Sequence, residues 1–169
     1  MTAATDLLTD GFTRVRDTVH QVLDGLAAEQ LRWRPAEAAN PIGWLVWHLT
    51  RVQDDHVAGV ADGRQCWIAD GWSARIETGH RESGVGYGDT TEQVGRVRAS
   101  ADQLAGYQDA VHARTIAFVT TLSDDELARV VDQSWDPPVT LAVRLVSVLD
   151  DATQHAGQAA YVRGLLDHS

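Results

Sequence analysis

The sequence of 169 residues contains a single cysteine, Cys66, and no lysine. One cysteine excludes an intramolecular disulfide and a cysteine-rich metal site, so any metal must be held by histidines and carboxylates. No stretch reaches the run of about 18 apolar residues that identifies a membrane-spanning helix. The first residues, MTAATDLLTDGF, lack the basic segment and apolar run of a secretory signal. We therefore expect a cytoplasmic protein with no membrane partner.

Positive charge is also scarce. The formal net charge is −10, and all 14 basic residues are arginine, a bias typical of a high-GC genome. This negative field repels a phosphate backbone, so no nucleic-acid partner is expected. Hydrophobic residues make up 44% of the chain and charged residues 22%, which is the balance of a globular protein. The length fits one domain over residues 1–169.

Apolar residues recur at helical spacing in four long segments, at about 6–26, 41–60, 91–121 and 141–166. Capping signals precede three of them: Asn40 before Pro41, Thr90 with Gln93, and Thr140. Ser123 with Glu126 starts a short helix through residue 130, and the glycine-rich stretch 61–89 is expected to be a long, functional loop. No strand pattern competes. The prediction is an all-α four-helix bundle with a long loop between helices two and three and a short extra helix before the last.

Three residues could form a metal site inside such a bundle. Asp151 and His155 are four residues apart and project from one face of the last helix, about 40° apart. His48 lies between apolar residues of the second helix, where an imidazole needs a partner. Two nitrogens and one oxygen are the usual protein ligands of a catalytic zinc. Alternatively, His48 is a hydrogen-bonded core histidine, and Asp151 is solvated or bonds His155.

Other residues near these three are candidates for supporting roles. Asp55, about 20° round the helix from His48, could fix its tautomer, and His56 could be a fourth ligand or a surface residue. Gln158 and Arg163 follow His155 within two turns or so. The guanidinium of Arg163 could hold a substrate carboxylate, or it could simply favour the helix C-terminus.

The loop contributes three further candidates. Trp67 and Trp72 are free to meet a substrate, whereas the tryptophans of the second helix are expected in the core. Cys66 could be a nucleophile, but no base and orienting group accompany it in the sequence, so inert packing is the alternative.

Two segments resemble the DinB-like superfamily. ANPIGWLVWHLTRVQDDH (39–56) is similar to its second helix, where a histidine followed by leucine binds metal, and DDATQHAGQAAYVRG (150–164) is similar to its last helix. The resemblance implies a metal-binding four-helix bundle with His48, Asp151 and His155 as ligands. Asp151 departs from the usual histidine, although the mycothiol-dependent maleylpyruvate isomerase branch has a carboxylate, glutamate, at that position.

The resemblance also implies a function: metal-dependent thiol chemistry, either transfer of a low-molecular-weight thiol to a small electrophile or a thiol-dependent isomerisation. The arginine-only composition favours mycothiol over bacillithiol or glutathione. Zinc suits the ligand set first, with nickel, iron or manganese as alternatives, and superfamily members are often homodimers. The rival hypotheses are a metal-dependent hydrolase and a metal- or ligand-binding bundle without catalysis.

Overall fold

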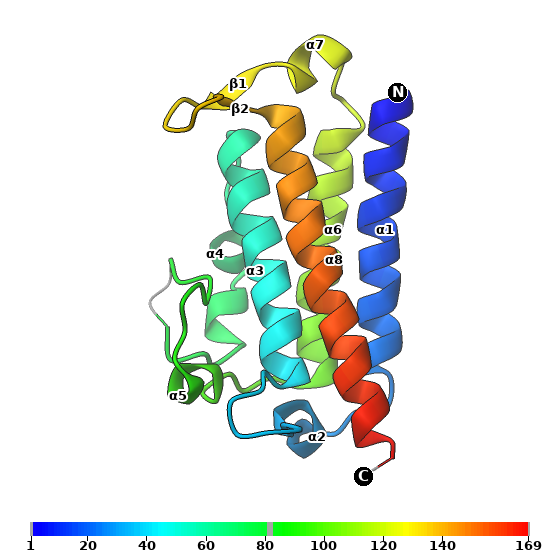
Figure 1. Ribbon diagram of the computed structural model, residues 1–169, viewed down its shortest axis with the longest axis vertical. Helices are drawn as coiled ribbons and strands as arrows, with labels where there is room; N and C mark the ends of the chain where they lie inside the picture. Colours follow the sequence, from blue (N-terminus) through cyan, green and yellow to red (C-terminus); the bar gives the residue numbers. More distant parts are fainter. Residues whose placement is uncertain (1, 81–82, 169) are drawn as a thin grey trace.

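Four long helices form the body of the protein in a computed structural model that describes residues 2–80 and 83–168. They are α1 (Ala3–Leu23), α3 (Ile42–Val60), α6 (Ala101–Val119) and α8 (Leu141–Leu166), and they lie side by side along the long axis (Figure 1). Helix α8 packs between α1 and α3, and α6 contacts the same two helices. The predicted bundle is therefore confirmed. Within the described part of the chain, no helix is long and apolar enough to span a membrane.

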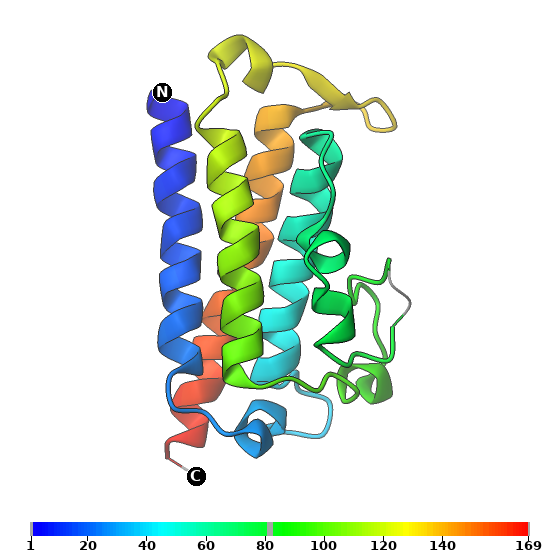
Figure 2. The same ribbon diagram turned by 180° about the vertical axis from the view of Figure 1, so that it is seen from behind.

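The long connection between α3 and α6 follows from the directions of these helices. Both run from the end of the bundle that holds α2 (Ala28–Arg32) toward the opposite end, while α1 and α8 run the other way (Figure 1). After α3 the chain must therefore return along the bundle before α6 can begin. The segment 61–100 makes this return beside α3 (Figure 2), so the predicted long loop is a crossover connection of the bundle.

The prediction of one continuous helix over 91–121 was wrong. The Thr90–Gln93 capping box starts only the single-turn α5 (Thr91–Val94), which ends at Gly95. A second capping box, Ser100 with Gln103, then starts α6. Between the two, Arg98 pairs its backbone with Glu77 of the crossover. That pairing uses backbone groups that a continuous helix would need for itself.

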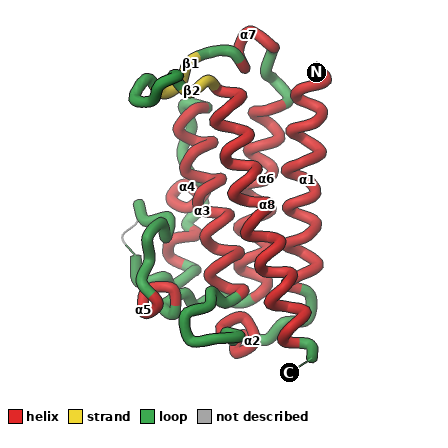
Figure 3. The backbone as a smooth tube through the Cα atoms, viewed as in Figure 1, coloured by secondary structure: helices red, strands yellow, loops and turns green. Residues whose placement is uncertain are grey.

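Several short elements were not predicted. The crossover contains α4 (Cys66–Ala69) and the 3₁₀ turn η1 (Trp72–Ala74). The expected helix from 123 to 130 stops as α7 (Asp124–Leu127), and β1 (Val130–Asp132) then pairs antiparallel with β2 (Val139–Thr140) at the end of the bundle (Figure 3). The helix α3 begins one residue later than expected, because extended Pro41 is its N-cap in place of Asn40.

The helix α3 is buried on nearly all sides, so its polar side chains must find partners inside the protein. Gln53 donates a hydrogen bond to Thr115 Oγ1 of α6 at 2.8 Å. Asp54 does the most: its carboxylate accepts the backbone N–H groups of Cys66 and Trp67, both at 2.8 Å, and the hydroxyl of Tyr107 at 2.8 Å. Asp54 thereby fixes the start of α4 and ties the crossover to the core.

Replacing Asp54 by alanine should lower the free energy of unfolding by about 3 kcal/mol, because two buried N–H groups and a buried hydroxyl lose their acceptor. Urea unfolding measures the change. Asp10→Ala is the matched control, since Asp10 pairs only with Arg14 at the surface and should change stability little. Equal effects of the two substitutions would show that Asp54 does not anchor the crossover.

Candidate metal centre

The contact between α3 and α8 brings the three predicted ligands together. His48, Asp151 and His155 each offer one ligand atom, and these atoms lie within 4.8 Å of one another. Metal–ligand bonds of about 2.0–2.2 Å allow two ligand atoms to be up to about 4 Å apart, so small side-chain rotations would place all three on one cation. We call these residues the triad. In donor type, two imidazoles and one carboxylate, they are a set that could hold a divalent metal.

Both imidazoles of the triad use the same nitrogen, Nδ1, for a hydrogen bond to a backbone carbonyl. His48 Nδ1 lies 2.5 Å from the backbone carbonyl of Val85, and His155 Nδ1 lies 2.9 Å from the backbone carbonyl of Asp151. A carbonyl oxygen only accepts, so both Nδ1 atoms carry the proton and both Nε2 atoms keep a free lone pair. Metal-binding histidines are held in this way by a hydrogen bond from the other ring nitrogen.

Asp151 supplies an independent sign of a ligand. Its Oδ2 is buried and has no hydrogen-bond partner among the described residues, and its Oδ1 lies 3.7 Å from His155 Nδ1. A buried oxygen without a partner costs free energy. A cation bound by the triad would remove this cost, so the residues present fit a metal.

The ring plane of His48 is fixed from the crossover side. Trp44 stacks on it with ring centroids 4.6 Å apart and an interplanar angle of 5°. The indole N–H of Trp44 donates to Asp89 Oδ2 at 2.9 Å, and His80 Nε2 lies 2.8 Å from the same carboxylate. The segment 84–89 therefore holds His48 twice, through the Val85 carbonyl and through Asp89 and Trp44.

Burial also sets the charge of His48. Desolvation lowers the pKa of His48, and the neighbouring His155 lowers it further, against the opposing effects of the Val85 carbonyl, Asp151 and Asp89. The imidazole is only 5% exposed. It is therefore neutral at physiological pH, which is the form that binds a metal.

A cavity of about 430 Å³ lies against the triad, between α3 and α8. Its walls are apolar at Val52, Val85 and Val148 and polar elsewhere. They include two of the triad residues, His48 and Asp151. The full lining consists of His48, Val52, Asp55, His56, Val85, Tyr87, Arg144, Ser147, Val148 and Asp151. Tyr87 is 93% exposed and lies at the outer rim. The space is large enough for a small-molecule substrate.

Two of the predicted supporting residues have other partners. Asp55 lines the cavity, yet it accepts a hydrogen bond from Gln65 at 2.7 Å, and Val85 rather than Asp55 fixes the tautomer of His48. Arg163 donates to the backbone carbonyls of Val22 and Asp24 and pairs with Asp167. It lies about 80° round the helix from His155, and its guanidinium ties α8 to the end of α1.

The remaining candidates lie outside the cavity. Gln158 is exposed. Trp67 is 3% exposed and Trp72 is half-buried, and both pack against Tyr107 of α6, so the prediction that they contact a substrate beside the triad is not supported. Cys66 is fully buried, and desolvation, followed by the charge of Asp54, raises the pKa of its thiol to about 12. Cys66 is therefore an inert residue of the core rather than a nucleophile.

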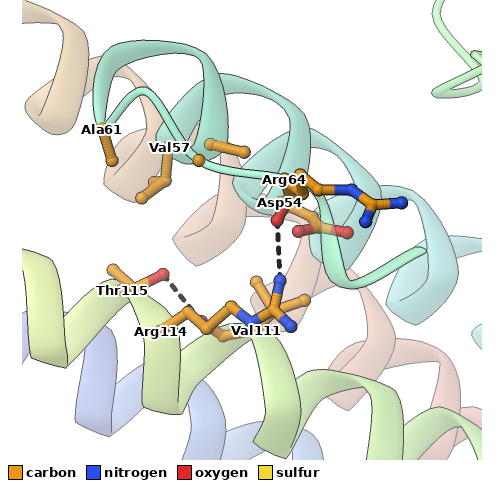
Figure 4. A pocket seen from close by; sticks show the side chains of 9 residues that line it. Asp54, Val57, Ala61, Arg64, Val111, Arg114 and Thr115 are labelled. Atoms are coloured by element: carbon orange, nitrogen blue, oxygen red, sulfur yellow. Dashed lines mark hydrogen bonds between the residues drawn. The ribbon is translucent and has the colours of Figure 1, made fainter. Parts of the chain in front are cut away.

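A second cavity, of about 210 Å³, lies between α3 and α6 (Figure 4). Most of its polar side chains already have partners: Arg114 donates to the backbone carbonyl of Arg64 and to Asp70, Thr115 donates to the Val111 carbonyl, and both Asp54 oxygens accept hydrogen bonds. This cavity therefore offers less chemistry than the one beside the triad.

Sequence reasoning missed three features of the site. The carbonyl of Val85 is a backbone group and leaves no side-chain signature. Gly86 was available as a signal, since glycines at alternate positions in GVGYG indicate close approach of a backbone. Arg144 lines the cavity, and it lies seven residues before Asp151, about 20° away on the helix.

Comparisons with known proteins agree with this description. The family model described as mycothiol-S-transferase matches residues 7–168. A crystal structure of a conserved protein from Enterococcus faecalis superimposes with a TM-score of 0.90 at 27% identity, covering 100% of this chain and 99% of that one. No curated protein matches the sequence. The bundle architecture is thus shared with a protein of known structure.

Gly86 gives a direct test of how the segment 84–89 supports His48. A Cβ at Gly86 would lie 2.8 Å from Trp47 Cζ3 and 3.1 Å from His48 Nδ1, whereas a Cβ at Gly88 would meet nothing within 4 Å. Both residues have positive φ, so both alanine variants carry a similar backbone strain. Gly86→Ala should be less stable than Gly88→Ala by about 1–3 kcal/mol in urea unfolding. Equal stability would show that the contact with His48 is loose.

Proposed function

Because the chain belongs to the mycothiol-S-transferase family of DinB-like proteins, we propose that it transfers a low-molecular-weight thiol, mycothiol by family, to a small electrophile with the help of a divalent metal held by His48, Asp151 and His155. The observation that carries the metal proposal is the buried, unpartnered Oδ2 of Asp151 between two imidazoles that keep their Nε2 lone pairs free.

The donor set favours zinc, with nickel, iron or manganese as alternatives. A divalent cation bound by three protein ligands keeps an open position and lowers the pKa of a coordinated thiol, so that thiolate is present at neutral pH. His48 and Asp151 are both in the wall of the cavity. The thiol therefore has access to the triad through the cavity.

The protein's own residues would orient the substrates and keep water away. The triad imidazoles are held by the carbonyls of Val85 and Asp151 and do not need to reorient on binding. Val52, Val85 and Val148 give the cavity apolar walls that displace water from the reacting groups. No side chain of the described cavity wall is a cysteine, so the nucleophilic sulfur must come from the co-substrate.

The metal proposal predicts stoichiometric metal in protein purified without an affinity tag. Asp151→Ala and His155→Ala should each lose most of it, because each removes one of three ligands. Asp150→Ala is the matched control: Asp150 is exposed, adjacent in sequence, and accepts only from Gln154. Mass spectrometry of metal content gives the answer. A wild type that remains metal-free even after added zinc would overturn the proposal.

The transferase proposal predicts that metal-loaded protein conjugates mycothiol to monochlorobimane and that His155→Ala abolishes the reaction. Fluorescence of the conjugate measures the rate, with bacillithiol and glutathione as alternative thiols. Hydrolysis of a test ester without any thiol would favour the hydrolase hypothesis instead. Stoichiometric metal with neither reaction would favour a binding protein without catalysis.

A further inference from the structure

We propose that Arg144 binds a carboxylate group of the substrate at the end of the cavity away from the triad. Sequence reasoning assigned this role to Arg163, which the structure ties to backbone carbonyls of α1. Arg144 is the one cationic side chain among the described residues that line the cavity. We call Arg144, His56 and Ser147, which line the same part of the cavity, the carboxylate subsite.

The subsite and the triad lie at a fixed separation. Helices α3 and α8 are antiparallel (Figure 1), so His48 lies beside Asp151, and His56 lies beside Arg144. Seven residues separate Arg144 from Asp151, which corresponds to about 10 Å along the helix. Val52 and Val148 lie in the stretch between the two ends. The cavity therefore matches a molecule with a reactive atom, an apolar middle and a polar end.

The guanidinium of Arg144 is positioned before any ligand binds. Its Nη2 donates to Asp132 Oδ2 at 3.0 Å, and its Nη1 lies 3.3 Å from His56 Nδ1. Asp132 is at the end of β1, so the short hairpin that the sequence did not predict serves to hold this arginine. These two contacts use two of the five N–H groups of the guanidinium. The others are available for a planar, bidentate acceptor such as a carboxylate.

The neighbours of Arg144 permit this role. Burial lowers the pKa of His56, and the charge of Arg144 lowers it further, so the imidazole is neutral and accepts from Arg144 without adding charge. Ser147 offers a hydroxyl in the same wall. Three carboxylates lie nearby: Asp132 pairs with Arg144, and Asp55 and Asp151 line the cavity, with Asp55 engaged by Gln65 through Oδ1. A ligand amine would go to Asp55 or Asp151 instead of Arg144, which makes the two charges of ligand distinguishable.

This inference deepens the proposed function and rests on it for the position of the reactive atom. Its first test needs no turnover: the full-length protein as purified is titrated with heptanoate, heptanamide or heptylamine and followed by NMR chemical shifts. We expect heptanoate to bind about tenfold more tightly than heptanamide, because it gains a charge-assisted contact. Arg144→Gln should remove this preference, Arg144→Lys should restore part of it, and Arg163→Gln should keep it.

An undiminished heptanoate preference in Arg144→Gln, or tighter binding of heptylamine, would overturn the inference. Melting temperatures of the variants identify any that fail to fold. If Arg144→Gln fails to fold, the heptanoate preference of Arg144→Lys is used as the test instead.

The source of the carboxylate is tested in the active enzyme by comparing an electrophile acid with its methyl ester, and a thiol acid with its amide. If the enzyme prefers the electrophile acid over its ester and this preference depends on Arg144, the carboxylate belongs to the electrophile. If it prefers the thiol acid over its amide in the same way, the carboxylate belongs to the thiol.

The two proposals fail separately. An Arg144-dependent carboxylate preference without thiol transfer would overturn the proposed function and leave the subsite. Thiol transfer with no Arg144-dependent preference in either pair would overturn the subsite and leave the function.

Discussion

The enclosure of α3 is the constraint on which the rest of the structure depends. A helix that is buried on nearly every face cannot leave its polar side chains to water, so most of them meet a partner inside the protein. Toward α6, these partners are side chains such as Thr115 and Tyr107. Toward the crossover, they are backbone groups: Asp54 accepts from residues 66 and 67, and Arg51 donates to the Gly84 carbonyl at 3.2 Å. These contacts anchor the described parts of the long connection to α3.

The proposed metal centre would satisfy further buried polar groups of α3 and α8. His48 is buried with the rest of α3, and it satisfies one nitrogen with the Val85 carbonyl. Its other nitrogen keeps a free lone pair, and the neighbouring Asp151 of α8 has a buried Oδ2 without a hydrogen-bond partner among the described residues. A cation satisfies both groups at once. Core packing and the proposed metal binding therefore depend on the same segment, 84–89, which closes over His48 and forms part of the cavity wall.

The structural features that depend on hydrophobic periodicity and on local residue spacing could be predicted from the sequence. The four helices, the capping residues Thr90, Ser123 and Thr140, and the triad were all readable, the last with the help of the family resemblance. Contacts between segments that are distant in the sequence could not be predicted. The hairpin around β1 is too short to give a strand pattern, and the break near Gly95 depends on pairing with Glu77. Arg163 was considered because it lies in the recognised motif, and Arg144 was not considered, although it lies on the same helix face as Asp151.

The burial of Cys66 has a consequence under the proposed transferase function. The chain has no lysine and no second cysteine, so the amine and thiol groups that electrophiles attack most readily are almost absent. The one thiol is fully buried, and its raised pKa leaves almost no thiolate at neutral pH. An electrophile held in the cavity therefore meets no competing sulfur of the protein. Under the proposed function, the buried thiol of Cys66 is therefore protected from alkylation by the substrate.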